Sequence, residues 1–244
     1  MPRSRNLYKP NLEKPFKLSR TKIESFMRCP RCFYIDRVDG VSVPSGPPFT
    51  LNSAVDNLLK SEFNVYREKS EPHPIILEYG IDAIPVKHEL LDRWRMNFKG
   101  IETTLEEFNL TVFGAIDDLW ISSKGEYIVV DYKATAKKDD IVALDSKWHE
   151  AYKRQMEIYQ WLLTCNGLKV SNTGYILYCN GNANEPAFKG KLDFRQTLHA
   201  HDGDNSWVYN VISELYKCLN SKRPDYSDDC EFCSYNIDYK NLNK

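Results

Sequence analysis

The sequence predicts a mixed α/β fold in which a central sheet is flanked by helices. Segments with apolar residues at helical spacing alternate with shorter segments rich in β-branched and aromatic residues. The chain has 244 residues, of which 42% are hydrophobic and 27% charged, which is ordinary usage for a globular protein with a sizeable core. One α/β domain with peripheral helices accounts for this length.

The first part of the chain is expected to hold two helices. Residues 1–17 carry basic and proline positions without apolar periodicity and are expected to form a mobile leader, so that the domain spans residues 18–244. A first helix is expected after Ser19, a capping residue, and should end at Pro30. A second is expected over residues 51–69, where apolar side chains recur at helical spacing, namely Leu51, Val55, Leu58, Leu59 and Phe63.

The middle of the chain changes from a helical to a strand period. Residues 104–122 and 125–135 contain alternating and β-branched runs with Gly125 at the turn between them, which is typical of an antiparallel hairpin. A helix over residues 147–164, strands over 173–180 and near 187–194, and a helix from about 205 to 219 are expected to complete the core.

Two aspartates and a lysine in this hairpin suggest a catalytic site. Residues i and i+2 of a strand face the same side, so Asp131 and Lys133 should lie together, with Asp117 on the neighbouring strand. Converging carboxylates suit Mg²⁺ or Mn²⁺, and a metal with an ammonium group could promote attack on a phosphodiester. Alternatively these are solvated strand-end charges. The buried character of residues 127–130 favours the functional interpretation, because burying unpaired charges is costly.

Three motifs in this region carry a family resemblance. GAID at 114–117, VVDYK at 129–133 and QMEIY at 155–159 resemble the PD-(D/E)XK nuclease superfamily. The opening LSRTKIESFMRCPRCFY is similar to the start of its RecB-like exonucleases, including the CRISPR-associated ones, and the matches together span residues 18–235. The resemblance implies a restriction-endonuclease-like fold and a DNA exonuclease activity.

The resemblance also implies roles for individual residues. Asp117 and Asp131 would hold the metal, the backbone carbonyl of Tyr132 would be a further ligand, and Lys133 would orient or activate water. Gln155 and Tyr159 match the Q-x-x-x-Y helix of the family, and their i, i+4 spacing places both on one face, toward either the active site or the DNA backbone. Their alternative is an ordinary helix packing face.

The sequence departs from the family pattern on the helix over residues 51–69. Where the family often carries G-x-x-x-H, with the histidine as an extra metal ligand, this chain has Asn52-Ser-Ala-Val-Asp56. Asp56 could ligate the same hard cation or could be a solvated helix residue.

A second constellation consists of two C-x-x-C pairs, Cys29 with Cys32 and Cys230 with Cys233. The odd total of seven cysteines fits a reducing compartment better than a disulfide framework. Joined, the pairs would bind an iron–sulfur cluster or, alternatively, Zn²⁺, and would link the termini through a clasp at about residues 220–235. The resembling exonucleases often build a cluster from one early and three late cysteines, whereas here the division is two and two. Unligated thiols are the remaining alternative.

The net charge of −1, from 33 basic and 34 acidic residues, excludes a global attraction to nucleic acid. Any DNA surface must therefore be a local patch. Candidate phosphate contacts are Arg20, Lys22, Arg28, Arg31, Lys137, Lys138, Lys153 and Arg154. Candidate stacking residues for unpaired bases are Tyr132, Trp148, Tyr152 and Tyr159.

We therefore expect a metal-dependent DNA nuclease acting in repair, recombination or mobile-element processing on DNA that is single-stranded or has free ends. A helicase or recombination protein would be its partner. No apolar run is long enough for a membrane span and the start lacks a secretory core, which favours a cytoplasmic protein without a membrane partner. One alternative is a catalytically degenerate DNA-binding module of the same fold, which Asp56 favours. Another is a cysteine-clasped structural protein with incidental hairpin charges.

Overall fold

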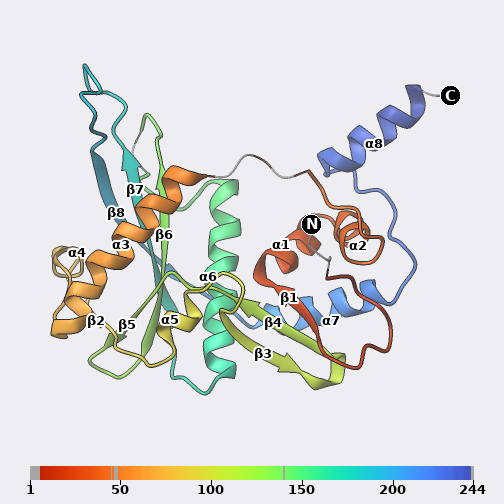
Figure 1. The fold of residues 1–244 in the computed structure, drawn as a ribbon, viewed down its shortest axis with the longest axis horizontal. Coiled ribbons are helices and arrows are strands. Elements are labelled where there is room, and N and C mark those ends of the chain that lie inside the picture. Colours follow the sequence, from red (N-terminus) through yellow and green to blue (C-terminus); the bar gives the residue numbers. More distant parts are fainter. Residues whose placement is uncertain (1–5, 45, 47–48, 140, 243–244) are drawn as a thin grey trace. The chain divides into compact units, whose positions relative to one another are not determined.

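The computed structural model describes residues 6–44, 46, 49–139 and 141–242 (Figure 1). The chain divides into two compact units, each built from more than one stretch of sequence. The first comprises residues 1–47, 102–113 and 206–244, and the second comprises residues 48–101 and 114–205. No described helix is long and apolar enough to cross a bilayer.

The first unit combines a small sheet with four helices. Its strands run in the order β1 (Phe16–Ser19), β4 (Leu110–Gly114) and β3 (Ile101–Leu105), with β1 parallel to β4. A 3₁₀ helix, Glu106–Phe108, connects β3 to β4. The helices are α1 (Arg20–Arg28), α2 (Pro30–Arg37), α7 (Trp207–Leu219) and α8 (Glu231–Leu242).

The start of the first unit confirms the expected helix after Ser19 and adds a second one. Cys29 is extended, which ends α1, and Pro30 then occupies the first turn of α2, where a proline costs no hydrogen bond. The expected mobile leader is wrong for residues 6–17. Tyr8 and Phe16 are buried, and the Tyr8 amide donates to the carbonyl of Arg37 at 2.7 Å. Residues 1–5 of that leader lie outside the described residues.

The second unit is built on a mixed five-stranded sheet, as the sequence predicts. The strand order is β2 (Ala83–Pro85), β5 (Asp118–Ser122), β6 (Tyr127–Thr135), β7 (Thr173–Gly181) and β8 (Phe194–Asp202). Among the described strands of this sheet, only β6 and β7 pair in parallel, and α6 (Lys147–Cys165) makes the connection between them. The other helices are α3 (Thr50–Lys69), α4 (Pro74–Glu78) and α5 (Leu91–Trp94).

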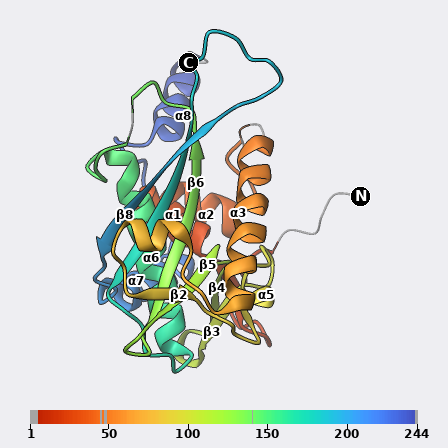
Figure 2. The same ribbon diagram turned by 90° about the vertical axis from the view of Figure 1, so that its left-hand side faces the viewer.

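Alternation along β6 sends its side chains to two different helices. Val130 and Tyr132 pack with Leu59 and Phe63 of α3 in one buried cluster, while Asp131, between them, is bonded to a side chain of α6. Figure 2 shows α3 and α6 on opposite sides of the sheet. The period of two in the sequence therefore decides which helix each functional side chain meets.

The elements of the second unit match the expected ones with three corrections. The run over residues 104–122 divides into β4 and β5 of different sheets, so Asp117 lies in the bend before β5 and not on a strand. On α3, Leu51 and Leu58 are exposed, because only one narrow stripe of the helix meets the sheet. The strand expected near 187–194 begins at Phe194.

Candidate active site

The structure brings Asp117, Asp131 and Lys133 together within the second unit. Asp131 is fully buried on β6, and the ammonium group of Lys133 pairs with its Oδ2 atom. The backbone N–H of Tyr132, between them, donates to Oδ2 of Asp117 at 3.0 Å. The Tyr132 carbonyl oxygen accepts from Nζ of Lys133 at 3.5 Å. The strand thus holds both carboxylates and the lysine in one place.

The helix α6 supplies the next two predicted residues. Nε2 of Gln155 donates to Oδ1 of Asp131 at 2.7 Å and to the hydroxyl of Tyr159 at 3.1 Å. Both residues are buried, one helical turn apart, and face β6. Of the two positions proposed for this pair, the structure places them at the carboxylates.

Asp56 approaches the same site from α3 with a lysine that the sequence interpretation missed. Nζ of Lys60 lies 2.8 Å from Oδ2 of Asp56 and 3.5 Å from Oδ1 of Asp117. Lys60 therefore bridges the substituted position of the family motif and one of the two central aspartates. The signal was present, since an Asp and a Lys at i, i+4 form a favourable pair on a helix surface.

Asp118, the neighbour of Asp117, has a structural role. Its side chain is fully buried and accepts hydrogen bonds from Arg67, from Arg95 at 2.7 Å and from the Tyr132 hydroxyl at 2.6 Å. Arg95 also donates through Nε to the carbonyl oxygen of Asp117 at 3.0 Å. This network fixes the bend that presents Asp117. The sequence pattern did not reveal either arginine, because both reach Asp118 from distant segments.

The carboxylates concentrate negative charge in a buried place. Burial raises the pKa of Asp131, the Lys133 charge opposes this rise, and the charge of Asp117 adds to it. Burial, with the charge of Asp117, likewise raises the pKa of Asp56. Burial alone would lower the pKa of Lys133, but Asp131 and Asp117 outweigh it, so the pKa of Lys133 is raised. Such an environment favours a cation.

The donor set fits a hard divalent cation such as Mg²⁺ or Mn²⁺. Oδ2 of Asp131 is buried and lies against the Lys133 ammonium. Carboxylate oxygens and a backbone carbonyl are the ligand types these metals prefer. Asp117, Asp131 and the Tyr132 carbonyl could hold the ion, with Asp56 nearby.

A cleft of about 500 Å³ opens beside Lys133. Its walls come from α3, the end of β6, α6 and β8, and include Phe49, Asn52, Asp56, Lys133, Tyr152 and Phe194. Asn52 ties α3 to β6 by donating to the carbonyl of Ala134 at 2.7 Å. Lys133 lies over the Tyr152 ring, with Nζ 4.8 Å from the centroid. The cleft therefore reaches two of the candidate site residues, Asp56 and Lys133.

The expected DNA-contacting residues are only partly available. The prediction that Tyr132 and Tyr159 stack on bases is wrong, because both side chains are buried. Trp148, in contrast, is 78% exposed. Lys22 is paired with Asp36 at 2.5 Å, and Lys153 with Glu150 at 2.7 Å. These ion pairs reduce the charge that either lysine could offer to a phosphate.

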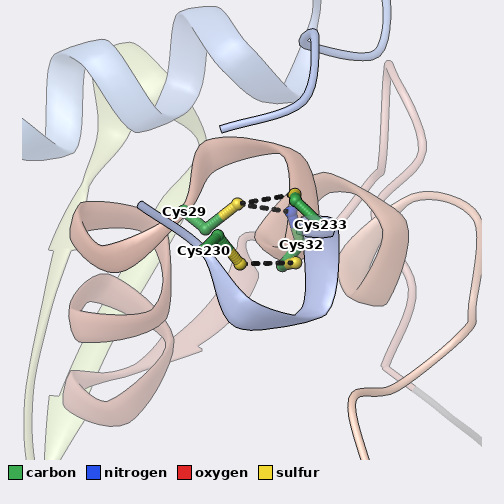
Figure 3. A group of neighbouring side chains, drawn as sticks. All are labelled: Cys29, Cys32, Cys230 and Cys233. Carbon is green, nitrogen blue, oxygen red and sulfur yellow. Dashed lines mark hydrogen bonds between the residues drawn. The ribbon is translucent and has the colours of Figure 1, made fainter. Parts of the chain in front are cut away.

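The four predicted cysteines converge within the first unit (Figure 3). The Sγ atoms of Cys29 and Cys233 are 3.7 Å apart, those of Cys32 and Cys230 are 3.6 Å apart, and all four lie within 4.8 Å of one another. Burial raises the pKa of the Cys29 and Cys32 thiols. The group could hold a metal, and it links the start of α2 to the start of α8.

Comparison with known proteins agrees with this geometry. A family model described as the PD-(D/E)XK nuclease superfamily matches residues 51–237, which include Asp117, Asp131, Lys133 and Gln155. A comparison with curated proteins gives no match. Among solved structures, the crystal structure of SSO0001 is similar with a TM-score of 0.39 and 14% identity, over 93% of this chain and 87% of that one, too weak a likeness to carry an argument. From the family match, which covers more than half of its length, the chain belongs to the PD-(D/E)XK nuclease superfamily.

Proposed function

We propose that this protein is a divalent-metal-dependent deoxyribonuclease of the RecB-like exonuclease branch, which hydrolyses phosphodiester bonds. The observation that carries the proposal is the convergence of Asp117, Asp131, Lys133 and Gln155 from three separate segments. Of these residues, Lys133 lines the cleft. Members of the superfamily are generally nucleases that use divalent metals.

The residues divide the catalytic work between them. Mg²⁺ or Mn²⁺ held by Asp117, Asp131 and the Tyr132 carbonyl would supply positive charge and acidify the attacking water. Gln155 occupies Oδ1 of Asp131, and the Lys133 ammonium lies against Oδ2. Burial would lower the pKa of Lys133, but the charges of Asp131 and Asp117 raise it. Lys133 would orient water and offset the extra negative charge of the transition state.

DNA with free ends is the proposed substrate, and single strands are favoured over duplexes. The cleft beside Lys133 is lined partly by aromatic side chains, of which Phe49 is 76% exposed, and such side chains can stack on unpaired bases. With the family resemblance, this supports a role in DNA repair, recombination or mobile-element processing. A helicase or recombination protein is the proposed partner, since either would present suitable ends.

A second candidate is a catalytically degenerate DNA-binding module of the same fold. The observation that favours it is the Asp56–Lys60 pair, because the family's metal-ligand position carries an aspartate whose carboxylate is already bound to an ammonium group. In this alternative Lys60 would replace the metal permanently.

Hydrolysis of end-labelled single- and double-stranded DNA in Mg²⁺ or Mn²⁺ separates the two candidates. We expect the wild type to cleave, and we expect Lys133→Ala and chelator each to abolish cleavage. Lys169→Ala, which removes a surface lysine paired with Glu126, is the control and should remain active. Folded wild type that binds DNA without cleaving either substrate in Mg²⁺ or Mn²⁺ would establish the degenerate module instead. The position of the label in the products gives the polarity.

A further inference from the structure

We propose that Cys29, Cys32, Cys230 and Cys233 form a tetrahedral site for a single zinc ion, and that this site holds no iron–sulfur cluster. The assignment rests on the separations between the four sulfur atoms and on the side chains around them. It is independent of the nuclease proposal, because the cysteines and the catalytic candidates belong to different units.

The sulfur separations match those around one zinc ion. With a Zn–S bond of about 2.3 Å and tetrahedral angles, two thiolate sulfurs on one zinc lie roughly 3.8 Å apart. Cys29 and Cys233 are 3.7 Å apart at Sγ, and Cys32 and Cys230 are 3.6 Å apart. Both of these distances join one C-x-x-C pair to the other, and every remaining separation stays within 4.8 Å. Figure 3 shows the four sulfur atoms pointing toward one another.

The iron–sulfur cluster implied by the family resemblance does not fit these separations. In a four-iron cluster each cysteine binds a different iron, and the irons with their bridging sulfides spread the cysteine sulfurs to roughly 6 Å. Two-iron clusters also place their two cysteine pairs on different irons. A group confined within 4.8 Å has no room for either core. The cysteines are also divided differently along the sequence. This chain has two early and two late cysteines, whereas the resembling exonucleases often have one early and three late.

The surrounding residues bury the cysteines and orient their sulfur atoms, as expected for a metal site. Cys29, Cys230 and Cys233 are buried and form a small core of their own, against which Cys32 and Tyr226 pack. The Cys32 amide donates to Sγ of Cys29 at 3.4 Å, which turns the two sulfurs of that pair to the same side. Pro30, between them, starts α2 and sets the direction of this turn.

The first C-x-x-C pair has a basic residue, Arg31, between its two cysteines in the sequence. The guanidinium of Arg31 stacks on the Tyr226 ring at 3.8 Å and donates to the carbonyl of Pro224 at 2.6 Å. Four thiolates with one Zn²⁺ carry a net charge of −2. The Arg31 guanidinium, stacked on the tyrosine ring that packs against the cysteines, would offset part of this charge. Arg31 also ties the first pair to the segment that leads into Cys230.

The site would be structural. Four protein ligands leave zinc no open position for water or substrate, which is the arrangement of structural zinc sites. Each thiol would give its proton to solvent as it binds zinc. Because the unfolded chain lacks the assembled site, zinc binding would also stabilise the fold that brings α2 and α8 together. The metal would therefore hold the first unit closed while a different metal serves the second.

The test is the metal and sulfide content of the full-length protein, purified without air and never unfolded. We expect about one zinc per chain, no acid-labile sulfide, no visible absorption band and four sulfur neighbours of zinc in X-ray absorption. Iron with sulfide, a single iron, or a folded protein with no metal in the cysteines would each overturn the assignment. None of these outcomes depends on whether the protein cleaves DNA.

Cobalt substitution supplies a second measurement that needs no cysteine variant, since Cys32→Ser could fail to fold. Replacement of the bound metal by Co²⁺ should give the intense absorption of tetrahedral thiolate cobalt. Cys165→Ser, which changes an exposed cysteine outside the group, should leave this spectrum unchanged. A cobalt spectrum without thiolate bands would contradict the proposal.

Discussion

Two adjacent aspartates show how burial and partners separate catalysis from structure. Asp117 is partly exposed and accepts a backbone N–H and a lysine, whereas Asp118 is fully buried between two arginines and a tyrosine hydroxyl. Sequence alone cannot distinguish them, because both follow the same apolar stretch. The family motif singled out Asp117, and the structure shows why Asp118 has a different task.

This contrast predicts that the same substitution at the two positions affects different properties, namely folding stability at Asp118 and metal binding at Asp117. Asp118→Asn removes the charge that compensates two buried arginines and should lower the free energy of unfolding by about 3 kcal/mol. Asp117→Asn should leave the free energy of unfolding nearly unchanged while weakening Mn²⁺ binding at least tenfold. Denaturant unfolding and isothermal titration measure the two quantities. Equal losses of stability in both variants would contradict the division of roles.

The position of Lys60 between two carboxylates predicts that its removal strengthens metal binding. Its ammonium group lies between Asp56 and Asp117, where it competes with a divalent cation for the same oxygens. Lys60→Met should therefore tighten Mn²⁺ binding by roughly tenfold, or about 1.4 kcal/mol. Isothermal titration checks this, with Lys169→Met, a surface lysine paired with Glu126, as the control. Weaker binding in Lys60→Met would mean that the lysine supports the site.

At the scale of elements, local patterns were predictable and long-range pairings were not. The period of two in residues 127–135 placed Asp131 and Lys133 on one side, and the helical period of residues 147–164 placed Gln155 and Tyr159 on one face. The break between β4 and β5 was missed because residues 104–122 read as one continuous run, while their pairing partners are β1 and β6. Short elements such as α2 carry too few residues to show a period.

The α1–α2 pair depends on one buried acid, which predicts a pH-dependent stability. Asp36 accepts from Lys22 at 2.5 Å, from Arg37 at 2.8 Å and from Ser42 at 2.9 Å. Burial opposes ionisation here, but Arg37 and Lys22 outweigh it, so the pKa of Asp36 is lowered. A carboxyl with a lowered folded pKa stabilises the fold above its unfolded pKa of about 3.9, and the contribution is lost as pH falls through the folded pKa.

Asp36→Asn should therefore cost about 2 kcal/mol of unfolding free energy near neutral pH. The difference from the wild type should shrink once the pH falls below about 4. Denaturant unfolding at a series of pH values measures this difference. A deficit that stayed constant into acid would mean that packing, and not the charge of Asp36, stabilises the α1–α2 pair.

At the scale of the whole molecule, the sequence predicted the fold class and the convergence of four cysteines, but not the division into two compact units. Each unit draws on segments far apart in the chain, and no local pattern specifies which segments pack together. The cysteines were an exception, because metal-ligand spacing is a strong local signal even when the two pairs lie near opposite ends of the sequence.

The central claim is that the buried Asp131 carboxylate takes part in metal-dependent DNA hydrolysis. The most direct measurement is the initial rate of cleavage of end-labelled single-stranded DNA in Mn²⁺ by the wild type and by Asp131→Asn. Asp82→Asn, an exposed aspartate next to β2, serves as the control. The account predicts a loss of at least roughly 100-fold in Asp131→Asn and no loss in the control. Undiminished cleavage by folded Asp131→Asn would contradict it.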